Sequence, residues 1–190
     1  MSDIANAVRV CERCRLHEGR LNAVLGEGDL SSPVVLVGEA PGRREDESGR
    51  PFVGSAGKLL DAALEHVGLT RSRVYITNVV KCRPPGNRKP RSDEVATCTL
   101  FLDEQLRIIT PRVVAPMGNS ALRHVFGRFG LERAVIGEVH GKPHPVDFSW
   151  GEGVVFPLYH PAAILYTRNL ETELRADLEA MVALLGSVSP

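Results

Sequence analysis

The sequence predicts an α/β fold in which helices cover both faces of a parallel sheet. Short apolar segments with strand character alternate along the chain with segments whose apolar residues recur at helical spacing. The first strand candidate, 33–38, has four apolar residues between a proline and a glycine, which is typical of a strand buried on both faces. The chain has 190 residues and no internal repeat, so we expect one domain over 1–190.

The first half of the chain contributes two strands and two helices. A helix is expected over 3–14, ahead of the first strand. After that strand come a polar loop rich in glycine and proline, 39–54, and a helix, 55–67, whose apolar residues are three and four positions apart. Gly68 is a typical residue at a helix end. A second strand is expected over 74–77.

The second half continues the alternation. A loop with three prolines, 81–91, follows the second strand. Ser92 suits the N-cap of a helix over 92–109, and Pro111 ends that helix. The interval 135–153 is less regular and has room for a hairpin. The remaining elements are a third strand over 112–116, a helix over 119–126, a fourth strand over 154–158 and a closing helix over 172–185.

The ends of these strands are where a site is expected. Ligands of parallel sheets bind beyond the carboxyl ends of the strands. The segments after the first, second and fourth strands begin close to Glu39, Asn78 and His160. We therefore expect these three side chains to meet around one ligand.

Composition excludes several classes of protein. The 23 basic and 23 acidic residues give a net charge of zero, so the chain is not a polycation that coats nucleic acid, and any basic surface must be local. Apolar residues make up 43%, which excludes global disorder. The apolar runs are too short for a membrane span, and the N-terminus has no apolar signal core. We therefore expect a cytoplasmic protein whose four reduced cysteines are metal or cluster ligands rather than disulfides.

Carboxylates gather after the first strand. The loop segment 38–47 holds four of them and lacks the pattern of a phosphate-binding loop. At a strand end, a carboxylate such as Glu39 or Glu45 can position or deprotonate water. The alternative is a solvated acidic loop in which Arg43 and Arg44 are the counter-charges.

Three further side chains are candidates for ligand binding. Phe52 is either a stacking surface for a flat ligand or a core residue. Asn78 offers a donor and an acceptor, which suits the edge of a pyrimidine; alternatively it closes the strand in a turn. His160 is held extended by the proline after it and can stabilise negative charge on a leaving group, or it is a hydrogen-bonded turn residue.

The four cysteines form one close pair and one spread pair. Cys11 and Cys14 make a C-x-x-C motif, whereas Cys82 and Cys98 are sixteen residues apart. Spacing alone does not decide between an iron–sulfur cluster and zinc, and four unrelated buried thiols are the third alternative. A metal or cluster would tie the first helix to the segment 81–98.

One tract is strongly basic. Five cations within 81–91, with no acid among them, form a candidate surface for DNA phosphates, where binding should weaken with salt. The alternative is an exposed, solvated loop. The five cations are Lys81, Arg83, Arg88, Lys89 and Arg91.

Seven motifs occur together in one order. They are C-x-x-C at 11–14, GEAPG at 38–42, GRPFVG at 49–54, TN at 77–78, KCRPP at 81–85, Cys98 and HPAA at 160–163. With this order and spacing, the chain closely resembles the family 4 uracil-DNA glycosylases, the iron–sulfur branch of that superfamily. The resemblance runs from about Cys11 to the C-terminal helix.

The resemblance implies a three-layer α/β/α sandwich around a four-stranded parallel sheet. It also implies that the cysteines hold one [4Fe-4S] cluster with a structural role, and that the substrate is uracil in DNA. Such an enzyme flips the nucleotide out, hydrolyses the N-glycosidic bond by a dissociative mechanism and leaves an abasic site. Nothing in the chain resembles the insertion of the branch that becomes covalently linked to DNA, so no lasting covalent intermediate is expected.

Roles for individual residues also follow from the resemblance. Better-known branches have an aspartate where Ala40 stands, so another group must handle the water; we favour Glu39, and Glu45 is the second choice. The matching residues are Glu39, Ala40 and Gly42 for the water-handling motif and the uracil pocket, Phe52 for stacking, Asn78 for uracil recognition, His160 for the departing base, Glu45 for an acidic pocket position, and Ile164 and Leu165 for the segment inserted into DNA.

The expected partner is DNA with uracil in a U·G pair, a U·A pair or a single strand, bound by a monomer without membrane contact. The expected setting is a prokaryotic cytoplasm, at the nucleoid during repair; contact with a replication sliding clamp is a further, unproven expectation. Two alternatives from other classes are a non-catalytic nucleic-acid-binding module and an interaction domain of a replication protein. The joint presence of Glu39, Asn78 and His160 favours the enzyme.

Overall fold

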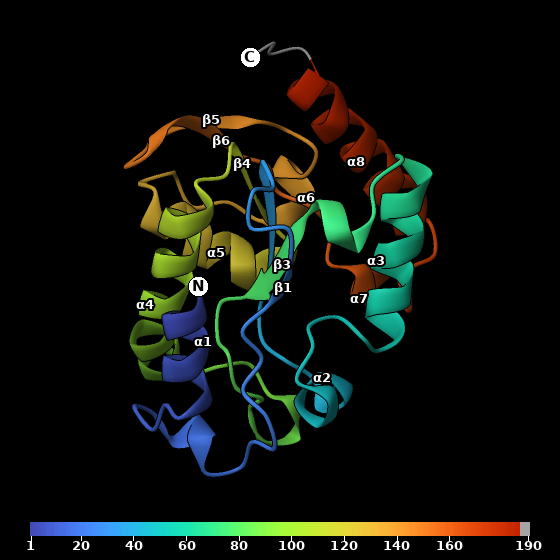
Figure 1. The fold of residues 1–190 in the computed structure, drawn as a ribbon. Helices are drawn as coiled ribbons and strands as arrows, with labels where there is room; N and C mark the ends of the chain where they lie inside the picture. Colours follow the sequence, from blue (N-terminus) through green and yellow to red (C-terminus); the bar gives the residue numbers. More distant parts are fainter. Residues whose placement is uncertain (187–190) are drawn as a thin grey trace.

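A six-stranded sheet lies between two layers of helices in the computed structural model, which describes residues 1–186 (Figure 1). The strand order is β1-β3-β2-β4-β6-β5. The four central strands are parallel, as the fold prediction requires, and β1 and β5 pair antiparallel at the two edges. The strands are β1 (Glu27–Gly28), β2 (Val34–Gly38), β3 (Tyr75–Asn78), β4 (Val113–Pro116), β5 (His144–Phe148) and β6 (Gly151–Val155).

The helices divide between the two faces of the sheet. Alternate side chains of a strand point to opposite faces, so Val35 and Val37 of β2 pack with α1, α4 and α5, whereas Val34 and Leu36 pack with α3, α7 and α8. Each face therefore has its own apolar core, and the predicted three-layer sandwich is confirmed. The helices are α1 (Ser2–Arg9), α2 (Arg43–Ser48), α3 (Ser55–His66), α4 (Ser92–Ile109), α5 (Gly118–Arg128), α6 (Ile136–Val139), α7 (Pro161–Ile164) and α8 (Leu170–Gly186). Within residues 1–186, every helix is too short or too polar to cross a lipid bilayer.

Several element boundaries differ from the sequence prediction. The first helix ends at Arg9, ahead of the C-x-x-C motif, and the loop 39–54 contains α2. The fourth strand begins earlier, at Gly151, because it forms a hairpin with β5 in the interval where a hairpin had room. Arg91, not Ser92, is the N-cap of α4, and the Glu94 carboxylate accepts its backbone N–H at 2.7 Å.

The carboxyl ends of the parallel strands lie at one edge of the sheet. Gly38 at the end of β2 is in register with Asn78 at the end of β3. On the other side of β2, Val37 is in register with Pro116 of β4, and a bridge joins Met117 to Leu158. The segments that follow these strands therefore leave the sheet side by side.

Candidate active site

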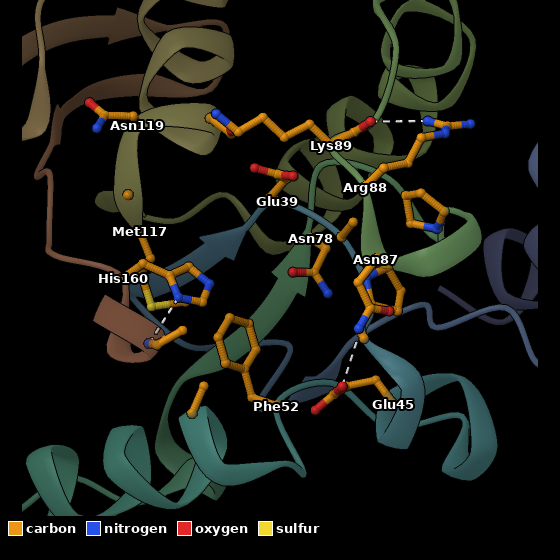
Figure 2. A pocket seen from close by; sticks show the side chains of 18 residues that line it. Glu39, Glu45, Phe52, Asn78, Asn87, Arg88, Lys89, Met117, Asn119 and His160 are labelled. Carbon is orange, nitrogen blue, oxygen red and sulfur yellow. Dashed lines mark hydrogen bonds between the residues drawn. The ribbon is translucent and has the colours of Figure 1, made fainter. Parts of the chain in front are cut away.

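An open cavity of about 510 Å³ lies at this edge of the sheet (Figure 2). The side chains predicted from three different strand ends share it, so their expected convergence is confirmed. Figure 2 shows the Asn78 amide, the Phe52 ring and the His160 ring facing the same space. The predicted residues that line the cavity are Glu39, Ala40, Gly42, Glu45, Phe52, Asn78, Arg88, Lys89 and His160.

Asn78 presents an unused acceptor to this cavity. The residue is 2% exposed, and its Oδ1 is buried without a hydrogen-bond partner in the described part of the chain. Leaving such a group unpaired costs about 1–3 kcal/mol, so a donor from a ligand would be stabilising there. Gly38 makes room for the amide, because a Cβ at this position would overlap Asn78 Oδ1 and lie 2.7 Å from Phe52 Cζ.

Phe52 is held in a backbone conformation that non-glycine residues rarely adopt. Its φ is 50°, and the cost of such strain is about 1–3 kcal/mol. Arg71 stabilises this conformation by donating from Nη1 to the Phe52 carbonyl at 2.8 Å and from Nη2 to the Pro51 carbonyl. The ring lies 5.6 Å from the His160 ring, between centroids. Phe52 also packs in the core, which confirms that alternative, and its stacking on a flat ligand stays a prediction.

His160 is the N-cap of α7 and is neutral at physiological pH. Burial lowers its pKa to about 4, although the charge of Glu45 opposes the shift. The ring Nδ1 accepts the backbone N–H of Ala162 at 3.1 Å, so the proton of the neutral ring is on Nε2. Gly118, with a φ of 79°, lets the ring approach, because a Cβ there would lie 2.9 Å from the Cβ of His160. The site thus holds a neutral imidazole with one free donor.

The two candidate carboxylates have different surroundings. Glu45 accepts three backbone N–H groups, from Gly42 at 3.1 Å and from Val53 and Gly54 at 2.9 Å each. These bonds join α2 to the segment that carries the stacking ring, so the Glu45 carboxylate shapes the pocket wall. For the Glu39 carboxylate no hydrogen bond or ion pair is present among residues 1–186, and it lines the cavity.

The four cysteines line one small enclosed cavity beneath α1 and α4. All are free thiols, and N–H groups approach two of the sulfurs: Arg20 Nη1 lies 3.2 Å from Cys82 Sγ, and the Lys81 backbone N lies 3.2 Å from Cys98 Sγ. Four sulfur donors with N–H groups directed at them suit a thiolate-ligated group. Within residues 1–186, no three His, Cys, Asp or Glu side chains are close enough to hold a single metal ion.

The prediction that Lys81 contacts DNA phosphate is wrong. Its side chain is 1% exposed, and Nζ donates to Thr77 Oγ1 at 2.8 Å, to the Asn78 carbonyl at 2.7 Å and to Gln105 Oε1 at 2.6 Å. Burial lowers the pKa of Lys81 to about 7, and these acceptors satisfy an amino group that would otherwise be buried without partners. Lys81 therefore braces the end of β3, directly behind the Asn78 amide.

The other four cations of the basic tract remain at the surface. Arg88 donates to both oxygens of the buried Glu94, at 2.8 and 2.6 Å, and these bonds lower the pKa of Glu94 to about 2. Arg83 donates to a neighbouring asparagine, and Lys89 and Arg91 are exposed. Lys89 is the tract's exposed cation at the cavity rim.

The expected insertion segment also needs a correction. Ile164 is 4% exposed and belongs to the core with α3 and α8, so it cannot enter DNA without unpacking that core. Leu165 directly after it is 51% exposed, and Tyr166 is more exposed still. The short helix α7, which was not predicted, sets which of these neighbouring residues is buried.

Sequence reasoning missed the contribution of β4. Met117, Gly118, Asn119 and Ser120 follow this strand and line the cavity. The rule applied to the other three strand ends would have identified them. Asn87, with a φ of 56°, is a further lining residue that carried no signal.

Comparison with known proteins agrees with this geometry. The family model described as the uracil DNA glycosylase superfamily matches residues 25–183. The chain is 44% identical to a type-4 uracil-DNA glycosylase of Archaeoglobus fulgidus, over 100% of this chain and 96% of the relative. It is 45% identical to one of Thermotoga maritima, over 92% and 87%, and 44% identical to one of Sulfurisphaera tokodaii, over 94% and 82%. The chain therefore belongs to the uracil-DNA glycosylase superfamily and, within it, to the type-4 uracil-DNA glycosylases.

Proposed function

We propose that this protein excises uracil from DNA by hydrolysing the N-glycosidic bond of deoxyuridine, which leaves an abasic site. The observation that carries the proposal is the buried, unpartnered Oδ1 of Asn78, which faces a cavity beside an aromatic ring and a neutral imidazole donor. Uracil has the matching groups, an N3–H donor between two carbonyl oxygens on a flat ring.

Asn78 accounts for the choice of base. Its Oδ1 accepts the N3–H of uracil, and its amide N–H donates to O4. Cytosine has an acceptor at N3 and a donor at C4, so both pairs would face like groups in a buried site. A site built for specific hydrogen bonds rejects an analogue that cannot make them by about 10⁴-fold or more.

The base must leave the duplex before it reaches this cavity. Flipping costs a few kcal/mol, and less at a mismatched pair. Stacking on Phe52 returns about 1–3 kcal/mol. The exposed Leu165 is suited to fill the gap left in the stack, because apolar wedges stabilise kinked, unstacked DNA.

Bond cleavage leaves negative charge on the departing uracil and positive charge on the sugar. His160 Nε2–H donates to O2 of the base, where the negative charge develops, and a donor of this kind contributes about 2.7–4 kcal/mol. Because the imidazole is neutral, it donates without transferring its proton. The Glu39 carboxylate orients the attacking water and favours the cationic sugar. The Glu45 carboxylate is less suited to this role, because three backbone N–H groups already hold it in the pocket wall.

The four-thiol cavity is proposed to hold a [4Fe-4S] cluster, and the sulfur donors fit such a group. When bound, the cluster supplies a cross-link between the segment after α1 and the segment 81–98, and hydrolysis needs no step from it. About four iron and four sulfide ions per chain would support this assignment. One zinc ion per chain in a colourless protein would overturn it.

Release of free uracil tests the proposed activity. The protein is incubated with matched duplexes that carry U·G, U·A or C·G at one position, and with single-stranded DNA, and the free base is quantified. We expect uracil from the uracil-containing DNA and no cytosine from the C·G duplex. DNA binding without base release would instead support the non-catalytic module.

A further inference from the structure

A second groove adjoins the active-site cavity. Its volume is about 450 Å³, and its lining shares Lys89 and Asn119 with that cavity. In Figure 2 the Lys89 side chain extends from the loop before α4 towards the start of α5, where Asn119 lies. Arg123 of α5 and Arg133, between α5 and α6, continue the groove away from the cavity. The two spaces thus lie side by side and meet at Lys89 and Asn119.

This groove has excess positive charge. Lys89, Arg123 and Arg133 are exposed, and among residues 1–186 none of the three is in an ion pair. The acid that lines the groove is Glu138, whose carboxylate lies 3.5 Å from the Val135 backbone N–H at the start of α6. By contrast, Arg88 and Arg128 nearby are paired with acids. Three cations that line one groove without acidic partners attract a polyanion.

We propose that the groove formed by Lys89, Arg123 and Arg133 binds backbone phosphates of the DNA strand that carries the flipped nucleotide. The inference rests on the proposed function, because a base seated in the cavity brings its own sugar–phosphate backbone to the cavity mouth. From there the strand must continue over the adjoining surface, and this surface is the cationic groove. The DNA footprint then extends across the end of β4, beyond the basic tract that the sequence indicates.

The salt dependence of DNA binding tests this proposal. The affinity for a duplex is measured by fluorescence anisotropy over a range of salt concentrations, with 2′-fluoro-2′-deoxyuridine at the target position. The electron-withdrawing fluorine disfavours the cationic sugar and suppresses cleavage. The test protein is the double variant Arg123→Gln, Arg133→Gln. The control is Arg73→Gln, since Arg73 is also exposed and lies at the opposite edge of the sheet, before β3 begins.

Each lost phosphate contact lowers the slope of log affinity against log salt by about 0.9 on duplex DNA. We therefore expect the double variant to lose about 1.8 from this slope and the control to keep the wild-type slope. At about 0.1 M salt this corresponds to roughly 60-fold weaker binding. A wild-type slope in the double variant would overturn the proposal, whether or not the affinity itself is weaker.

Failure of the groove assignment can be distinguished from failure of the proposed uracil excision. Uracil release by the wild-type protein is measured in parallel on the unmodified duplex. If the wild type releases uracil while the double variant keeps the wild-type slope, only the groove assignment fails. If the wild type releases no uracil, the proposed function fails, and the slope on uracil-free duplex still decides whether the groove binds phosphates.

Discussion

Gly38→Ala should disable base recognition by adding one methyl group. The new Cβ would overlap Asn78 Oδ1 and lie 2.7 Å from Phe52 Cζ. A comfortable separation between carbon atoms is about 3.5 Å, so the ring edge must move by about 0.8 Å, and the amide must also move. Misplacement by about 1 Å costs about 10²-fold in rate. Forcing an extra methyl into a packed site costs about 1–3 kcal/mol of stability.

The assay compares kcat/KM for uracil release with the free energy of unfolding. Gly127→Ala is the matched control, because a Cβ at this position in α5 would meet no atom within 4 Å beyond its chain neighbours and the backbone of its own helix. We expect wild-type activity in the control, with stability raised by about 1 kcal/mol because alanine is the better helix former. A folded Gly38→Ala protein with wild-type kcat/KM would show that Asn78 and Phe52 do not hold the base where the cavity places them.

Five further outcomes are expected. His160→Ala should lower kcat by about 10²–10³-fold with little change in KM, because the donor acts on charge that develops in the transition state; single-turnover rates test this. Since burial lowers the pKa of His160 to about 4 from 6.5, uracil release should stay constant from neutral pH down to about pH 5 and fall only near pH 4, and a rate halved at pH 6.5 would contradict the neutral imidazole. Between these two pKa values the unfolded chain takes up the proton first, so the contribution of His160 to stability is complete above pH 6.5 and is lost towards pH 4, as acid titration of the unfolding midpoint would show. Asn78→Asp should damage selectivity for uracil, and retained selectivity in a competition assay would assign recognition elsewhere. Gln105→Leu should destabilise the fold by about 1–3 kcal/mol in denaturant titrations, because the buried Nζ of Lys81 loses an acceptor at 2.6 Å.

The central sheet and its site were predictable because they depend on local signals. The apolar run of β2 between a proline and a glycine predicts a buried strand, and the strand-end rule then locates Glu39, Asn78 and His160 at one edge. The edge strand β1 was not predicted, because two residues ending in a glycine carry no periodic pattern.

The errors concern side chains whose state is set by distant partners. Lys81 is buried because Gln105, 24 positions later, supplies an acceptor, and composition alone makes a lysine in a basic loop look exposed. Arg71 supports Phe52 through backbone carbonyls, which have no signature in the sequence. Ile164 and Leu165 are both apolar and adjacent, so only the turn of α7 decides which one faces solvent.

A crystal structure of the protein with uracil bound tests the recognition geometry most directly. We expect the base to lie against the Phe52 ring, with N3 about 2.7–3.2 Å from Asn78 Oδ1 and O2 at a similar distance from His160 Nε2. A uracil seated elsewhere, or one in this cavity whose N3–H does not meet Asn78, would contradict the proposed recognition and the mechanism built on it.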